Sequence, residues 1–88
     1  MRARLSTKIV EMSPGQCKAA RALLDWTQSE LARAAELGLS TVVDFEKQRR
    51  VVSEEALNAI RRALEEAGIE FLDGDRPGLR LHKPIRRR

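Results

Sequence analysis

The sequence contains few residues of the kinds that build catalytic, metal-binding or disulfide sites. Its 88 residues include one cysteine, Cys17, and one histidine, His82. A single cysteine excludes an internal disulfide, and the two residues together fall short of the roughly four ligands that a structural zinc site needs. No nucleophile or acid–base set can be assembled around them, so we expect neither an enzyme nor a protein that depends on a metal or cofactor. Cys17 shares a face with apolar residues and is expected to be a small buried hydrophobe.

Long apolar segments are also missing. No run approaches the ~18 apolar residues needed to cross a bilayer, and the N-terminus lacks a signal-peptide pattern. We therefore expect no contact with a membrane and a cytoplasmic location. Aromatic residues make up only 3% of the chain, and Trp26, the one tryptophan, is expected to fill the core instead of stacking on bases. A chain of this length forms one small domain, which is marginally stable unless it dimerises.

Positive charge is scarce in the body of the chain, although the formal net charge is +4. Residues 1–12 carry +2 and residues 80–88 carry +5, so residues 13–79 carry −3. Attraction to phosphate must therefore come from the ends and from local clusters, not from a basic body. We interpret residues 1–12 as a flexible basic arm and residues 82–88 as a basic tail.

Residues 27–48 carry the clearest pattern, which predicts two short helices joined by a tight turn around Gly38. After Gly38 the apolar spacing turns Val42 and Phe45 inward. The polar residues of that second helix, expected at about residues 39–47, then point outward: Ser40, Thr41, Asp44 and Lys47. This arrangement is typical of a helix-turn-helix, whose second helix can lie in the major groove of DNA.

Two further helices and a hairpin are predicted around this unit. Ser13 with Gln16 starts a helix ahead of it, and Ser53 starts one that Gly68 ends. The domain therefore spans residues 13–68. From residue 69 to 81 the pattern alternates around a turn-rich loop, which predicts a β-hairpin. Two strands alone are marginally stable, so the hairpin must lean on the helices or pair with a second copy. We favour the second role, with Phe71, Leu79 and Leu81 at a dimer interface.

The helix-turn-helix residues also resemble a known family. The runs Trp26-Thr27-Gln28-x-x-Leu31-Ala32 and Ser40-Thr41-Val42-x-Asp44-Phe45-Glu46 resemble, in order and spacing, the XRE family of lambda-repressor-like bacterial regulators. The likeness covers residues 13–64. It implies a mainly α domain that acts as a dimer, usually as a repressor or as the antitoxin partner of a toxin. Here we expect four helices with a short C-terminal hairpin in place of the fifth helix of many relatives.

The resemblance also implies roles for single residues. An arginine at the position of Arg21 pairs in the family with the glutamate at Glu46, which would brace the first helix against the reading helix. Glutamine at Gln28 holds a backbone phosphate, although a solvated glutamine is the alternative. The loop after the reading helix lies along the phosphates, so we expect Lys47, Arg49 and Arg50 to contact them.

The chain departs from the family at several positions. Relatives usually have glycine where this chain has Glu36, in a left-handed conformation, and commonly at Gln48, where the reading helix ends. The first reading position is Leu39 instead of an amide or arginine. Leu39 suits a thymine methyl, and Ser40 and Thr41 suit a base or phosphate. Asp44 suits a cytosine amino group but equally repels phosphate.

Two functions remain in competition. The first is a dimeric transcriptional regulator that binds double-stranded DNA through the residues named above. The second is a protein-interaction module on the same fold, in which Leu39 and Val43 bind a partner such as a toxin. The regulator is the leading hypothesis, and the acidic body and the poor set of base-reading side chains are the features that support the alternative.

Overall fold

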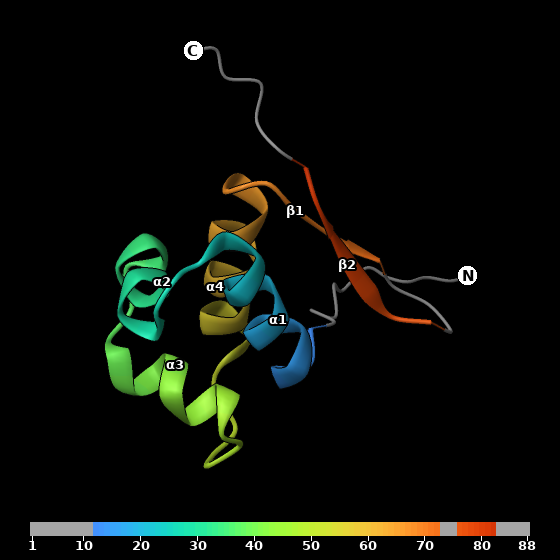
Figure 1. Cartoon of the computed structure of the whole chain (residues 1–88). Coiled ribbons are helices and arrows are strands. Elements are labelled where there is room, and N and C mark those ends of the chain that lie inside the picture. Colours follow the sequence, from blue (N-terminus) through green and yellow to red (C-terminus); the bar gives the residue numbers. More distant parts are fainter. Residues whose placement is uncertain (1–11, 73–75, 83–88) are drawn as a thin grey trace, which may run out of the picture.

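The computed structural model describes residues 12–72 and 76–82 and shows four helices followed by a two-stranded hairpin (Figure 1). The elements are α1 (Pro14–Leu24), α2 (Gln28–Ala35), α3 (Leu39–Glu46), α4 (Glu54–Glu66), β1 (Ile69–Leu72) and β2 (Gly78–Leu81). The expected mainly α fold with a C-terminal hairpin is therefore confirmed. The expected basic arm up to residue 11 and the tail from residue 83 lie outside the described residues.

Local hydroxyl caps start three of the helices. Ser13 Oγ accepts from the amide of Gln16 at 3.0 Å, and the Gln16 side chain accepts from the amide of Ser13 at 2.9 Å. Thr27 and Glu30 form the same reciprocal box at the start of α2. Ser53 Oγ accepts from Ala56 at the start of α4. Each cap satisfies amides that have no partner within the helix, so residues close in the sequence determine where these three helices begin.

The first three helices end through one shared backbone geometry. After each helix one non-glycine residue takes a positive φ, namely Asp25 (61°), Glu36 (60°) and Gln48 (56°). The next amide then bonds to the carbonyl five residues back, as in the 2.9 Å bond from the Trp26 amide to the Arg21 carbonyl. This is the Schellman end, and glycine is the residue that adopts it at least cost. The expectation of left-handed backbone at Glu36 is therefore confirmed.

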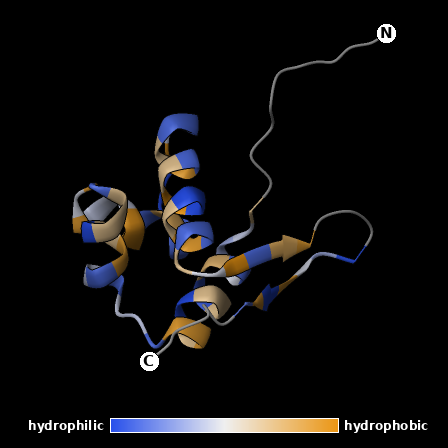
Figure 2. Cartoon of the chain, turned by 90° about the horizontal axis from the view of Figure 1, so that it is seen from above, coloured by the Kyte–Doolittle hydropathy of each residue, from blue (hydrophilic) through white to orange (hydrophobic). Residues whose placement is uncertain are grey.

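The core gathers the inner faces of all four helices. Its fully buried side chains include Cys17, Leu31, Val42, Ile60 and Leu64. Trp26 is half-buried and packs against this cluster, so it contributes to the core as expected. Figure 2 shows polar and apolar residues alternating along the helices, which is the pattern of elements with one face on a core.

The hairpin packs against its own helices. β1 and β2 pair antiparallel, with Phe71 opposite Leu79 and Ile69 opposite Leu81. Phe71 is only 7% exposed, and the guanidinium of Arg61 lies 4.6 Å from the centre of its ring. The ring therefore packs within its own chain, and its expected contact with a second copy stays a prediction. Leu79 and Leu81 are half-buried against the same core.

Two further contacts fix the hairpin to the helices. The side-chain amide of Gln16, on α1, donates to the Gly78 carbonyl at 3.1 Å. Gly68 has a φ of 115° and follows α4, and its carbonyl accepts from the His82 amide. A β-carbon at Gly68 would lie 2.6 Å from the His82 carbonyl oxygen. Only glycine therefore fits this point, where α4 turns into β1.

Candidate nucleic-acid interface

Helix α3 has one buried face and one open face. Val42 is fully buried, and Phe45 is 9% exposed, as the spacing predicted. On the other side Ser40 and Lys47 are exposed, whereas Thr41 and Asp44 are half-buried. Thr41 therefore points out less fully than expected. The open face begins with an apolar residue, since Leu39 is 46% exposed.

Glu46, on the inner face of α3, is the one buried charged residue within the described parts of the chain, at 1% exposure. Arg21 of α1 meets it with two parallel bonds, Nε to Oε2 and Nη2 to Oε1, each 2.8 Å long. This is the contact that the family resemblance implied. A bidentate guanidinium fixes orientation as well as charge, so it ties α3 to α1 at a set angle.

Two more side chains complete this buried cluster, and neither was expected there. The Cys17 thiol donates to Glu46 Oε2 at 3.1 Å, and the Gln28 amide donates to Oε1 at 2.9 Å. The carboxylate therefore receives four hydrogen bonds from α1 and α2. The sequence carries no signal for these contacts, because Cys17 and Gln28 lie 29 and 18 residues from Glu46.

The pKa values of this cluster follow from its burial and its bonds. Burial by itself raises the pKa of Glu46, but the hydrogen bonds from Arg21, Cys17 and Gln28 outweigh it and hold the pKa below its usual range. Burial raises the pKa of the Cys17 thiol far above its usual range, and the neighbouring Glu46 carboxylate adds to the rise. The thiol is therefore kept protonated and unreactive, which agrees with its expected role as a packed core residue.

Gln28 stands at the first position of α2 but does not point its amide nitrogen to solvent. That nitrogen donates to Glu46, so the side chain helps to hold α2 against α3. Its backbone amide remains at the N-terminus of the helix, where the dipole favours an anion. The structure thus gives Gln28 a structural contact that neither of the two expectations for it included.

The loop after α3, residues 47–50, brings two arginines back beside the helix. The positive φ of Gln48 reverses the chain, and the Arg49 amide bonds to the Asp44 carbonyl at 2.9 Å. Arg50 Nε then lies 2.8 Å from Asp44 Oδ2, and Arg49 Nη1 lies 3.9 Å from Oδ1. Both arginine side chains are more than half exposed. The cations expected to meet phosphate therefore share one carboxylate on the open face.

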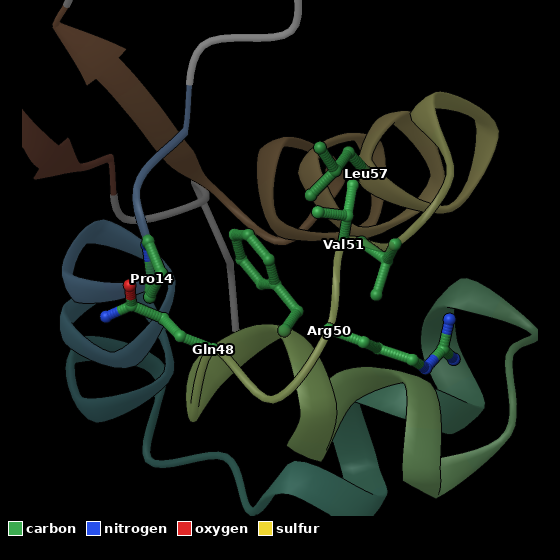
Figure 3. Close-up of a pocket in the computed structure, with 7 residues that line it drawn as sticks. Pro14, Gln48, Arg50, Val51 and Leu57 are labelled. Carbon is green, nitrogen blue, oxygen red and sulfur yellow. The ribbon is translucent and has the colours of Figure 1, made fainter.

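A shallow pocket lies beneath this loop. It holds about 350 Å³ and is lined by five apolar side chains and two polar ones: Pro14, Phe45, Val51, Val52 and Leu57, with Gln48 and Arg50. Figure 3 shows the side chain of Arg50 extending away from the apolar residues, on the side of α3. Arg50 therefore lines the pocket and, through its bond to Asp44, also borders the open face of α3.

Two kinds of site are missing from residues 12–72 and 76–82. No group of three or more histidine, cysteine, aspartate or glutamate side chains there is arranged to hold a metal ion. Among the same residues, no helix has the length and apolar character needed to span a bilayer.

Comparison with protein-family models identifies a helix-turn-helix domain in the chain. The family model described as helix-turn-helix matches residues 18–71, which is more than half of the chain and includes all of α2, α3 and α4. A comparison with curated proteins finds no match.

Proposed function

We propose that this chain, which belongs to the XRE family of lambda-repressor-like helix-turn-helix proteins, regulates transcription by laying α3 in the major groove of DNA as a dimer. Membership of the family makes it a DNA-binding helix-turn-helix protein. The finer proposal is a repressor or antitoxin-like regulator with weak sequence preference. The observation that carries it is the anchoring of α3 by its inner face alone, which leaves the outer face open.

The outer face suits a duplex in two ways. Ser40 and Lys47 are exposed at opposite ends of α3, where hydroxyl and ammonium groups can meet bases or phosphates. Arg49 and Arg50 follow directly in the loop, and cations there position a protein on the backbone without reading sequence. We assign a backbone phosphate to the main-chain amide of Gln28, at the N-terminus of α2, and base edges to Leu39 and Thr41. Asp44 is assigned no base, because its carboxylate is paired with Arg50.

A second copy of the chain completes this proposal. One reading helix of this length covers a single half-site, and dimers of the motif place two such helices about 34 Å apart. Leu79 and Leu81 on β2 are only half-buried, and the outer edge of a hairpin strand offers unpaired backbone groups. We propose this edge as the dimer contact.

Removing the loop cations tests the proposal. Arg49→Ala with Arg50→Ala should weaken binding to every duplex by a similar factor, and should flatten the dependence of affinity on salt by about two ions. Fluorescence anisotropy with a labelled duplex at ~50 to ~200 mM salt measures both. The matched control is Arg62→Ala with Arg76→Ala, which removes the same charge from exposed positions outside α3 and its loop. Equal binding by the loop variant and the wild type would contradict the proposal.

A protein-interaction module is the second candidate. It is favoured by Leu39, which is 46% exposed at the start of α3, and by Asp44, which holds the loop arginines. In this case the open face binds a partner such as a toxin. Electrophoretic shift against a library of random duplexes separates the two. An enriched motif supports the regulator, and no shift at ~50 mM salt, where phosphate attraction is strong, supports the module.

A further inference from the structure

We infer that Asp44 limits the affinity of the chain for DNA by competing with the phosphate backbone for Arg50. This inference rests on the proposed DNA-binding function and names the residue that tunes it. Asp44 is the acidic residue on the open face of α3, and the structure gives its carboxylate two arginine partners from the loop that should meet phosphate.

The geometry makes Arg50 the principal partner. Arg50 Nε lies 2.8 Å from Asp44 Oδ2, which is the length of a charge-assisted hydrogen bond, whereas Arg49 Nη1 is 3.9 Å from Oδ1. The pair does not arise from helical spacing, because Arg50 follows Asp44 by six residues and lies beyond the helix. The left-handed turn at Gln48 brings the two together.

The solvent exposure of Arg50 indicates that its ion pair with Asp44 adds little to stability and is open to competition from a ligand. The Asp44 side chain is 19% exposed and Arg50 is 52% exposed, so the carboxylate is sheltered while the guanidinium remains open to solvent. Exposed ion pairs contribute little to stability. A phosphate oxygen is an equally good partner for a guanidinium, and Arg50 can satisfy only one of them through the same nitrogen.

The same carboxylate also acts directly on an approaching duplex. A DNA duplex carries one negative charge per ~1.7 Å of its axis, so a fixed carboxylate on the reading face repels it. Loss of the Asp44 charge therefore removes a repulsion and releases a cation. Each released cation that meets a phosphate steepens the plot of log affinity against log salt by about 0.9.

The test is a cycle of four full-length proteins: wild type, Asp44→Asn, Arg50→Ala and the double variant. Each is titrated by anisotropy against one random-sequence duplex at ~50 and ~200 mM salt. Asp44→Asn should bind about 3- to 10-fold more tightly at ~50 mM, and a single extra phosphate contact should make this gain about 3-fold smaller at ~200 mM. Glu66→Gln, at the exposed end of α4, changes the net charge equally and should leave affinity within about 2-fold.

The cycle separates the possible roles of Asp44. On the Arg50→Ala background the gain from Asp44→Asn should shrink to that of simple charge removal. An undiminished gain there would overturn competition for Arg50. Weaker binding by Asp44→Asn, confined to sites with cytosine at one position, would instead assign Asp44 to base reading. Tighter binding of the duplex by Asp44→Asn than by the wild type supports the inference, and equal binding does not.

The proposed function and this inference fail in different ways. If the wild type and Asp44→Asn both fail to bind at ~50 mM salt, both proposals are overturned. If the wild type binds and Asp44→Asn binds equally, the inference alone is overturned. Circular dichroism melts of all four proteins establish that each is folded at the temperature of the titration.

Discussion

Replacing Arg21 with alanine tests whether the buried carboxylate of Glu46 holds the reading helix in place. The substitution removes both 2.8 Å bonds from the guanidinium and leaves Glu46, at 1% exposure, with only the Cys17 thiol and the Gln28 amide as donors. Those two donors are uncharged. The carboxylate therefore becomes a buried charge without a countercharge. This raises the free energy of the folded state and weakens the attachment of α3 to α1.

The expected loss is large for a domain of this size. Breaking a buried pair by removing one partner costs about 3–5 kcal/mol. We expect the lower end, about 3 kcal/mol, because the Arg21 side chain is 20% exposed and water partly replaces it. A domain of 88 residues is stable by roughly 4–13 kcal/mol. If the wild type lies near the lower end of this range, urea titration should show that the variant has lost most of its free energy of unfolding. The melting temperature should fall by about 12 °C or more.

The pH dependence supplies an independent check. In the wild type the pKa of Glu46 is lowered from 4.5, so its contribution to stability is present above pH 4.5 and is lost as the pH falls through the lowered value. Without Arg21, burial becomes the dominant influence and raises the pKa above 4.5. A raised pKa destabilises the fold at neutral pH and spares it at low pH. The difference in stability between the two proteins should therefore shrink as the pH falls from 7 towards 4.5.

A second variant keeps this test decisive if Arg21→Ala does not fold. Arg21→Met with Glu46→Met removes both charges and fills the space with apolar side chains, an exchange that is often neutral or stabilising. It should unfold at a urea concentration close to that of the wild type. The account of Glu46 would be refuted if Arg21→Ala lost less than about 1 kcal/mol at pH 7, or if the double variant were the less stable of the two.

The remaining predictions concern the backbone. Gly68→Ala should destabilise the chain by about 1–3 kcal/mol in urea titrations, because it places a β-carbon 2.6 Å from the His82 carbonyl oxygen at a φ of 115°. The control is Gly78→Ala, whose β-carbon meets nothing within 4 Å and which should leave the free energy of unfolding nearly unchanged. Gln48→Gly should stabilise by about 0.5–1 kcal/mol, since Gln48 has a φ of 56°; a loss of stability would contradict the left-handed end of α3. Ser53→Ala should cost about 1 kcal/mol through the lost cap on Ala56, and an unchanged urea midpoint would show that the cap contributes nothing.

Local signals made much of the fold predictable. Ser13 with Gln16 and Thr27 with Glu30 act over three residues, so the starts of α1 and α2 could be predicted from the chain alone. The spacing that buried Val42 and Phe45 is equally local. Gly68 marked the end of α4 because few other residues adopt its φ.

The candidate site was less predictable, because it depends on contacts between distant residues. Nothing near Gln28 in the sequence indicates that its amide meets Glu46, and Cys17 shows only that it is apolar enough to be buried. The position of Arg50 beside Asp44 depends on a left-handed turn at Gln48, where the sequence has no glycine to indicate one. The hairpin was predicted, but its packing on the helices was the less favoured of two alternatives, since that packing depends on how Phe71 meets α4.

The central claim is that the open face of α3 and the loop of residues 47–50 meet DNA. Titration of the ¹⁵N-labelled chain with a duplex, followed by amide chemical shifts, tests it most directly. The account predicts the largest changes at Leu39, Ser40 and residues 47–50, with smaller ones at the start of α2. Changes confined to the hairpin or to the outer face of α4, or none at ~50 mM salt where phosphate attraction is strong, would contradict it.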